Sequence, residues 1–120
     1  MTNEQYDKMI ELLKETTQND KLKWNYNKSS DKFYTYINDC KIELNIRFNA
    51  GIQDSIASIE LFNQDGLSFA TYSFYSKVDV DDYNKLNDLD DIVRDKYYKI
   101  TESESIIISG LEKINDLISL

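Results

Sequence analysis

Six aspartates lie close together in the sequence, at positions 79, 81, 82, 88, 90 and 91. Clustered carboxylates are the ligands that hard cations such as Ca²⁺ prefer. This cluster, however, lacks the central glycine and the closing glutamate of an EF-hand loop, and Asn84 and Lys85 interrupt it. The same acids suit the start of a helix, where carboxylates cap free amides and offset the helix dipole. We interpret the cluster as a solvated acidic helix start, and we predict no metal site and no cofactor.

Few side chains that catalyse reactions near neutral pH are present. The sequence has no histidine and one cysteine, Cys40. Histidine is the usual general base and the commonest transition-metal ligand, and a nucleophilic thiol normally needs a basic partner. We therefore interpret Cys40 as an incidental thiol and predict that the protein is not an enzyme. Hydrolysis by carboxylates alone stays open, because two facing acids can cleave a glycoside, but the sequence does not place such a pair.

Aromatic side chains on the predicted strands are the strongest candidates for binding. Several of them fall in the strand phase opposite to the main apolar pattern, so a sheet face left uncovered by helices would display them. Tyrosine offers a large amphipathic contact area and is enriched at interface hot spots. The alternative, that these rings pack inward, also stays open. With acids from the helix start, the candidate partner-binding residues are Tyr34, Tyr36, Tyr72, Phe74, Asp81, Asp82, Asp88 and Asp91.

The charge balance limits the kinds of partner. The chain has 22 acidic and 14 basic residues and a formal net charge of −8, which argues against binding nucleic acid or an anionic membrane. An acidic surface would instead complement a basic patch on a protein, although it also simply favours solubility. No apolar run approaches a membrane span, and no signal peptide is evident. With its lone cysteine, the chain is expected to be cytoplasmic.

The elements that must position these residues begin with five strands. Ile42, Leu44, Ile46 and Phe48 alternate with polar residues in the stretch 41–48, which predicts a strand with one dry face. Further strands are predicted at 22–26, 32–37, 55–62 and 67–75, and Asn63-Gln64-Asp65-Gly66 forms a hairpin turn between the last two. These strands predict an antiparallel meander, and Trp24 is expected to anchor its core.

Helices are predicted on both sides of the strands. Thr2 and Gln5 have the spacing of a capping box, and they start a helix at about 3–16. After the strands, the stripe Leu86, Leu89, Val93 and Tyr97 predicts a second helix. Thr101 and Glu104 have capping-box spacing again, which predicts a third helix with Ile107, Leu111, Ile114 and Ile118 facing inward. The prediction is a single α+β domain over residues 1–120: a five-stranded antiparallel meander flanked by one N-terminal and two C-terminal helices.

This outline resembles a recurrent pattern of helix, β-meander and two helices among small bacterial and mobile-element proteins. The resemblance lies in Trp24 at the first strand, the turn at 63–66, and the segments 86–89 and 111–114. It implies no catalytic residue, cofactor or substrate. We expect a non-catalytic protein-binding module, such as an immunity-type or anti-defence inhibitor or an acidic chaperone, and a homodimer through an edge strand or the last helix is open. The alternative is a small-ligand-binding protein with a pocket between sheet and helices.

Overall fold

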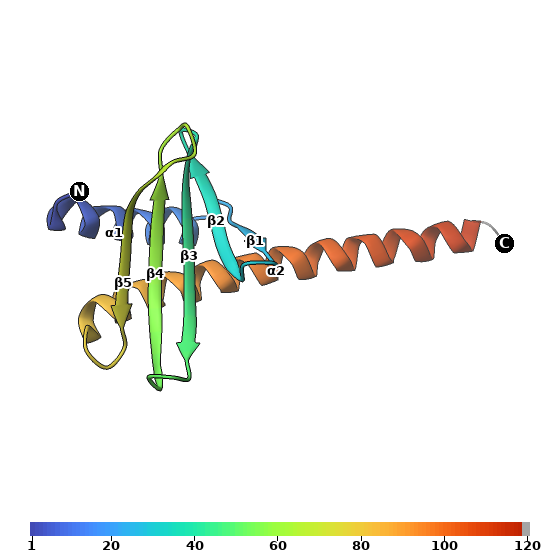
Figure 1. Ribbon diagram of the computed structural model, residues 1–120. Helices are drawn as coiled ribbons and strands as arrows, with labels where there is room; N and C mark the ends of the chain where they lie inside the picture. Colours follow the sequence, from blue (N-terminus) through green and yellow to red (C-terminus); the bar gives the residue numbers. More distant parts are fainter. Residues whose placement is uncertain (119–120) are drawn as a thin grey trace.

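The structure, a computed structural model, describes residues 1–118 and has two layers (Figure 1). One layer is a sheet of five strands, and the other is a pair of helices lying against one of its faces. In chain order the elements are α1 (Asn3–Gln18), β1 (Asn25–Asn27), β2 (Lys32–Ile37), β3 (Cys40–Asn49), β4 (Asp54–Phe62), β5 (Ser68–Tyr75) and α2 (Val80–Ile118).

The five strands form an antiparallel meander in the order β1-β2-β3-β4-β5, which confirms the predicted sheet. The turn between β4 and β5 also follows the sequence. The Asn63 side chain accepts hydrogen bonds from the backbone amides of Asp65 and Leu67, and Gly66 has the positive φ (82°) that suits glycine. The first strand is shorter and later than expected, since Leu22 and Trp24 precede β1 and still pack into or against the core.

The core lies between the sheet and the two helices. Alternate side chains of β2, β3 and β4 meet apolar stripes from α1 and α2, as the period-2 and period-3.6 patterns predict. Trp24 is 4% exposed, and its indole Nε1 donates to the buried Thr17 Oγ1 at 3.0 Å, which confirms its role as a core anchor. The most deeply buried large side chains are Ile10, Phe33, Leu44, Ile59, Leu86, Leu89 and Val93.

The predicted capping box at the start of α1 is confirmed. The Gln5 amide donates to Thr2 Oγ1 at 3.1 Å, and the Thr2 amide donates to Gln5 Oε1 at 2.8 Å. Each contact satisfies a backbone donor that the first helical turn would otherwise leave free. This end of α1 lies beside the start of α2 (Figure 1).

The prediction of two C-terminal helices is wrong, because residues 80–118 form one helix of 39 residues. Thr101 is not an N-cap: its hydroxyl donates to the Tyr97 carbonyl at 2.9 Å, one turn back along the same helix. No proline interrupts this segment, and Gly110 lowers helix stability without stopping the helix. A hydroxyl and an acid at capping-box spacing are equally compatible with a helix interior, so the local pattern was ambiguous.

The inward orientation predicted for the last apolar stripe is also wrong. Ile107, Leu111 and Ile114 are each more than half-exposed, and the side chain of Ile118 lies outside the described residues. The physical reason is that α2 is longer than the sheet is wide. The sheet spans only the first half of α2, and the second half projects past the β1 edge into solvent (Figure 1).

Candidate functional site

The sheet face turned away from the helices is polar and open, and it carries two of the predicted binding residues. Tyr34 and Tyr36 lie there with their rings 6.2 Å apart in a T-shaped arrangement, and Tyr36 is exposed. The ammonium of Lys41 sits 5.4 Å from the centre of the Tyr34 ring and 5.3 Å from that of Phe62. Cation–π contacts of this kind hold the rings in place on the sheet surface.

Two acids that the sequence did not single out lie opposite each other on this open face. Glu43 of β3 is in register with Glu60 of β4. Lys41 Nζ is 3.7 Å from Glu43 Oε2, and the Ser68 hydroxyl donates to Glu60 Oε2 at 2.6 Å. Both carboxylates are thus engaged by neighbours that offset the repulsion expected of like charges facing each other across two strands. Only the strand register brings them together, so no pattern within one strand could have revealed the pair.

Tyr72 and Phe74 lie on the other face of the sheet, so the expectation that they join Tyr34 and Tyr36 on one uncovered face is wrong. Both are half-buried and pack against the core from β5. The ring of Tyr6, on α1, lies 4.7 Å from that of Tyr72 and 6.1 Å from that of Phe74. The reason is the phase of β5: its even-numbered residues from Ala70 to Phe74 face the helices.

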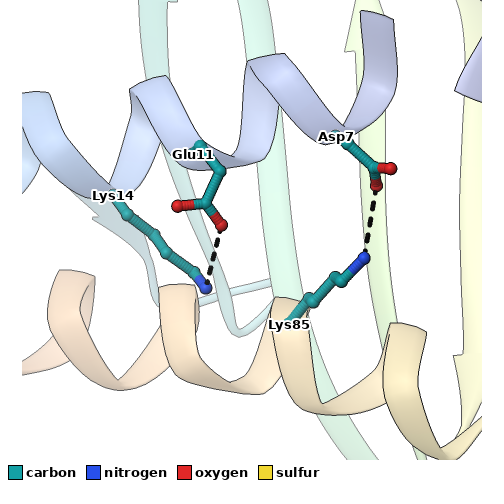
Figure 2. Close-up of polar contacts among 4 residues, drawn as sticks. All are labelled: Asp7, Glu11, Lys14 and Lys85. Carbon is teal, nitrogen blue, oxygen red and sulfur yellow. Dashed lines mark hydrogen bonds and ion pairs between the residues drawn. The ribbon is translucent and has the colours of Figure 1, made fainter. Parts of the chain in front are cut away.

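These three rings form the floor of what we call the acidic-aromatic pocket. It has a volume of about 260 Å³ and lies between β5 and the starts of α1 and α2. Asp7 and Lys85 connect the two helices at its rim, with Lys85 Nζ 3.5 Å from Asp7 Oδ1 (Figure 2). The seven lining residues are Asn3, Tyr6, Asp7, Tyr72, Phe74, Asp82 and Lys85.

The Tyr6 hydroxyl is the unusual group of this pocket. Tyr6 is 5% exposed, and within residues 1–118 its hydroxyl has no hydrogen-bond partner. Burial raises the pKa of this phenol, and the carboxylates of Asp82 and Asp7 raise it further. The hydroxyl therefore stays protonated at any physiological pH and keeps both a donor and an acceptor free. An unsatisfied buried hydroxyl normally costs stability, so its position suggests a role outside the folded chain itself.

The predicted aspartates divide between two environments. Asp82 lies in the first turn of α2 and lines the acidic-aromatic pocket, while Asp81, Asp88 and Asp91 are exposed along α2 and do not converge with it. Nowhere in residues 1–118 do three or more acidic or thiol side chains come together in an arrangement that would hold a metal ion. The structure thus brings Tyr72, Phe74 and Asp82 together out of the eight candidates, and it leaves Tyr34 and Tyr36 as a separate pair.

Asp90 is the acid that the sequence analysis did not distinguish from its neighbours. It is buried in the first half of α2, where its Oδ2 is 3.5 Å from Arg94 Nη2. The Arg94 guanidinium in turn lies 5.1 Å from the centre of the Phe33 ring. Burial raises the pKa of the Asp90 carboxyl, and the charge of Arg94 opposes that rise. Its heptad spacing from Tyr97 was the available signal, since it places position 90 on the buried stripe.

Comparison of the chain with protein-family models, with curated proteins and with solved structures found no match. Of the helices described, neither α1 nor α2 combines the length and the apolar character that a membrane span requires.

Proposed function

We propose that this protein is a non-catalytic binding module whose acidic-aromatic pocket receives a cationic side chain of a protein partner. One observation carries the proposal: the carboxylate of Asp82, and that of Asp7 with Lys85 Nζ 3.5 Å away, stand beside an aromatic floor and a buried hydroxyl that has no partner within residues 1–118. Aromatic rings attract cations, carboxylates pair with guanidinium or ammonium, and the hydroxyl of Tyr6 can accept a hydrogen bond. An arginine or lysine side chain would use all three groups at once.

The charge of the whole chain supports a basic partner. With a net charge of −8, the chain attracts a positively charged surface and accelerates the encounter. Within this class, an inhibitor that covers a basic site on a toxin or nuclease, or an acidic chaperone, is the activity that we propose. Tyr34 and Tyr36 on the open sheet face would be a second contact area for a partner large enough to reach around the sheet edge.

A short arginine peptide tests the pocket directly. The full chain is titrated with tri-arginine amide while its backbone and Tyr side-chain resonances are followed by NMR. Shifts are expected at Tyr6, Tyr72 and Asp82. Asp82→Asn should weaken binding by roughly ten- to a hundredfold, because a hydrogen bond to a charged group contributes roughly 1.5–3 kcal/mol.

The matched control is Asp91→Asn, which removes the same charge from an exposed position on the same helix. It should lower affinity only slightly, through the long-range field. Equal weakening in the two variants, or shifts spread evenly over the surface, would mean that the peptide senses net charge and not the pocket, and the proposal would fail.

A small-ligand function is the second candidate, because the pocket lies between the sheet and both helices and combines apolar walls with convergent polar groups. Its volume of about 260 Å³ is slightly below the roughly 300–1,000 Å³ typical of small-molecule sites. Titration with n-butylammonium separates the two ideas. Binding of this amine as tightly as the peptide would favour a small organic cation as the natural ligand, whereas much weaker binding favours a protein.

A further inference from the structure

The projecting half of α2, residues 101–118, exposes an unusual amount of apolar surface; we call it the extension. Six of its aliphatic side chains are between 56% and 71% exposed: Ile106, Ile107, Ile108, Leu111, Ile114 and Leu117. Single exposed aliphatic residues are common, but a contiguous group of this size on a projecting helix is typical of an interaction surface.

This surface continues the stripe with which α2 covers the sheet. Leu86 and Val93 are fully buried at seven-residue spacing, and Ile100, Ile107 and Ile114 follow at the same spacing along the helix. A seven-residue repeat keeps side chains on one face of a helix, so we call this line the seam. The seam is thus buried by the chain's own sheet as far as residue 93 and is left uncovered beyond residue 100. Opposite it, the extension is polar, with Ser105, Ser109 and Asp116.

We propose that a second copy of this chain covers the uncovered seam, with the two extensions packed antiparallel in a symmetric dimer. The position of the sheet decides the direction. In each copy the sheet occupies the seam side of the first half of α2. If the two α2 helices paired in parallel, the sheets of the two copies would therefore collide (Figure 1). In the antiparallel arrangement each sheet lies beyond the tip of the other extension, and both seams are covered over their whole free length.

The sequence of the extension fits this self-pairing. With the dyad at the axial level of Ser109, Ile107 of one copy lies opposite Leu111 of the other, and two such contacts form the centre. Ile114 then faces Glu104, whose carboxylate reaches toward Lys23 of its own chain at 4.0 Å. Glu104 is the one acid on the seam between residues 100 and 114, so it is expected to weaken the dimer and to leave it reversible.

The length of the contact sets its strength. From residue 100 to 118 the helix is roughly 27 Å long, and pairing two such segments would bury on the order of 1,000 Å² in total. That area is at the lower limit for a specific interface, so the dimer should form at micromolar concentrations and exchange with monomer. The net charge of −8 on each copy opposes association, and added salt should therefore strengthen the dimer. Salt should weaken binding of a basic partner at the acidic-aromatic pocket, which makes the two proposals separable.

Sedimentation equilibrium of the full chain between 5 and 200 µM tests the dimer. The wild-type chain should show a monomer–dimer equilibrium, and Leu111→Asp should be monomeric throughout. Ser109→Asp adds the same charge to the polar side of the extension and should dimerise like the wild type. Both positions lie outside the core, and unchanged circular dichroism would confirm that each variant is folded. Glu104→Leu should tighten the dimer by about tenfold or more.

A disulfide experiment tests the direction of pairing in a Cys40→Ser background. Mixed Ile107→Cys and Leu111→Cys chains should form a heterodisulfide on oxidation, whereas Ile107→Cys alone should remain largely reduced. Preferential linkage of two Ile107→Cys chains would indicate a parallel pair and would overturn the arrangement.

Two further outcomes would overturn the proposal. One is a wild-type chain that is monomeric at 200 µM. The other is loss of the dimer on Leu12→Asp. Leu12 lies with Met9 and Ile37 in a separate apolar groove of about 320 Å³ along α1. Sensitivity there would mean that the extension inserts into that groove of another copy instead of pairing with the other extension.

Discussion

Buried polar atoms without partners are the residue-scale feature that most needs an explanation. Within residues 1–118 they include the Tyr6 hydroxyl and Asp90 Oδ1. Each costs stability in an isolated chain, because water has been removed and no hydrogen bond replaces it. The two differ in their surroundings. Tyr6 lines the acidic-aromatic pocket, although its hydroxyl is itself buried, whereas Asp90 lies inside the α2 stripe beside Arg94.

Tyr6→Phe should stabilise the fold and weaken binding at the same time. Removing a buried hydroxyl without a partner is expected to raise the free energy of unfolding by about 1 kcal/mol, as measured by urea denaturation. The same variant should bind tri-arginine amide less tightly than the wild type. Tyr36→Phe, on the open sheet face, is the control and should change neither quantity. A Tyr6→Phe chain that is destabilised would show that the hydroxyl is satisfied in the folded chain.

Asp90→Asn should change how stability depends on pH. The folded chain raises the pKa of Asp90 above its ordinary value of 3.8, so the folded state holds this proton more tightly than the unfolded state. The free energy of unfolding should therefore fall as the pH rises from about 4 through the folded pKa, and it should level off above that pKa. Asn cannot ionise, so the difference in stability between Asp90→Asn and the wild type should change in favour of Asn as the pH rises from 3 through the folded pKa of Asp90.

The exposed Asp91→Asn variant provides the control for that pH series. Thermal melts at several pH values should give parallel curves for Asp91→Asn and the wild type. A difference between Asp90→Asn and the wild type that does not vary with pH would exclude the titration of Asp90 as its cause.

At the scale of elements, the strands could be predicted and the last helix could not. Period-2 alternation in 41–48 and a turn built from Asn63 and Gly66 are local signals, and the sheet obeys both. The division of α2 into two helices failed because a capping box is also local: Thr101 and Glu104 fit a helix start and a helix interior equally well. Whether an apolar stripe is covered depends on how far the sheet extends, and no stretch of α2 encodes the width of the sheet.

The candidate site was partly predictable for the same reason. Helix-start chemistry placed Asp82 in the first turn of a helix, but strand phase placed Tyr72 and Phe74 on the uncovered face of the sheet, where the structure does not have them. These three residues meet Tyr6 and Asp7 only because α1 packs on α2 and β5. Residues 6 and 7 precede positions 72–82 by about 65 residues or more in the sequence. Tyr6 has helical spacing to Met9, Ile10 and Leu13, which is typical of a buried stripe, and nothing in that spacing distinguishes a satisfied hydroxyl from a free one.

Gly110→Ala should stabilise the extension as an element. Apart from the adjacent residues and the backbone of the helix itself, a methyl group at this position would meet no described atom within 4 Å, and alanine is favoured over glycine in a helix interior by about 1 kcal/mol. Helicity at 222 nm should rise, and amide exchange in residues 104–114 should slow, at concentrations where the chain is monomeric. Ser109→Ala is the neighbouring control and should give a smaller change. No change in exchange would indicate that the extension is already held by another contact.

At the scale of the whole molecule, the body and the extension should be thermodynamically separate. No core residue of the described chain lies beyond Val93, and the contact from Glu104 to Lys23 is an exposed ion pair at 4.0 Å that contributes little. Deleting residues 104–120 should therefore shift the melting temperature by less than about 4 °C. The shortened chain should also be monomeric. A large drop in melting temperature would show that the extension packs on the body in solution.

The projecting helix also governs how the molecule moves through a solvent. The described fold has a radius of gyration of 17.8 Å and a longest extent of 62 Å, whereas a compact globule of this length has a radius of gyration of roughly 14 Å. A single copy will therefore diffuse with a large frictional ratio and elute from a gel-filtration column ahead of spherical standards of 14.1 kDa. Its early elution would mimic association, and mass must be measured by a method that does not depend on shape.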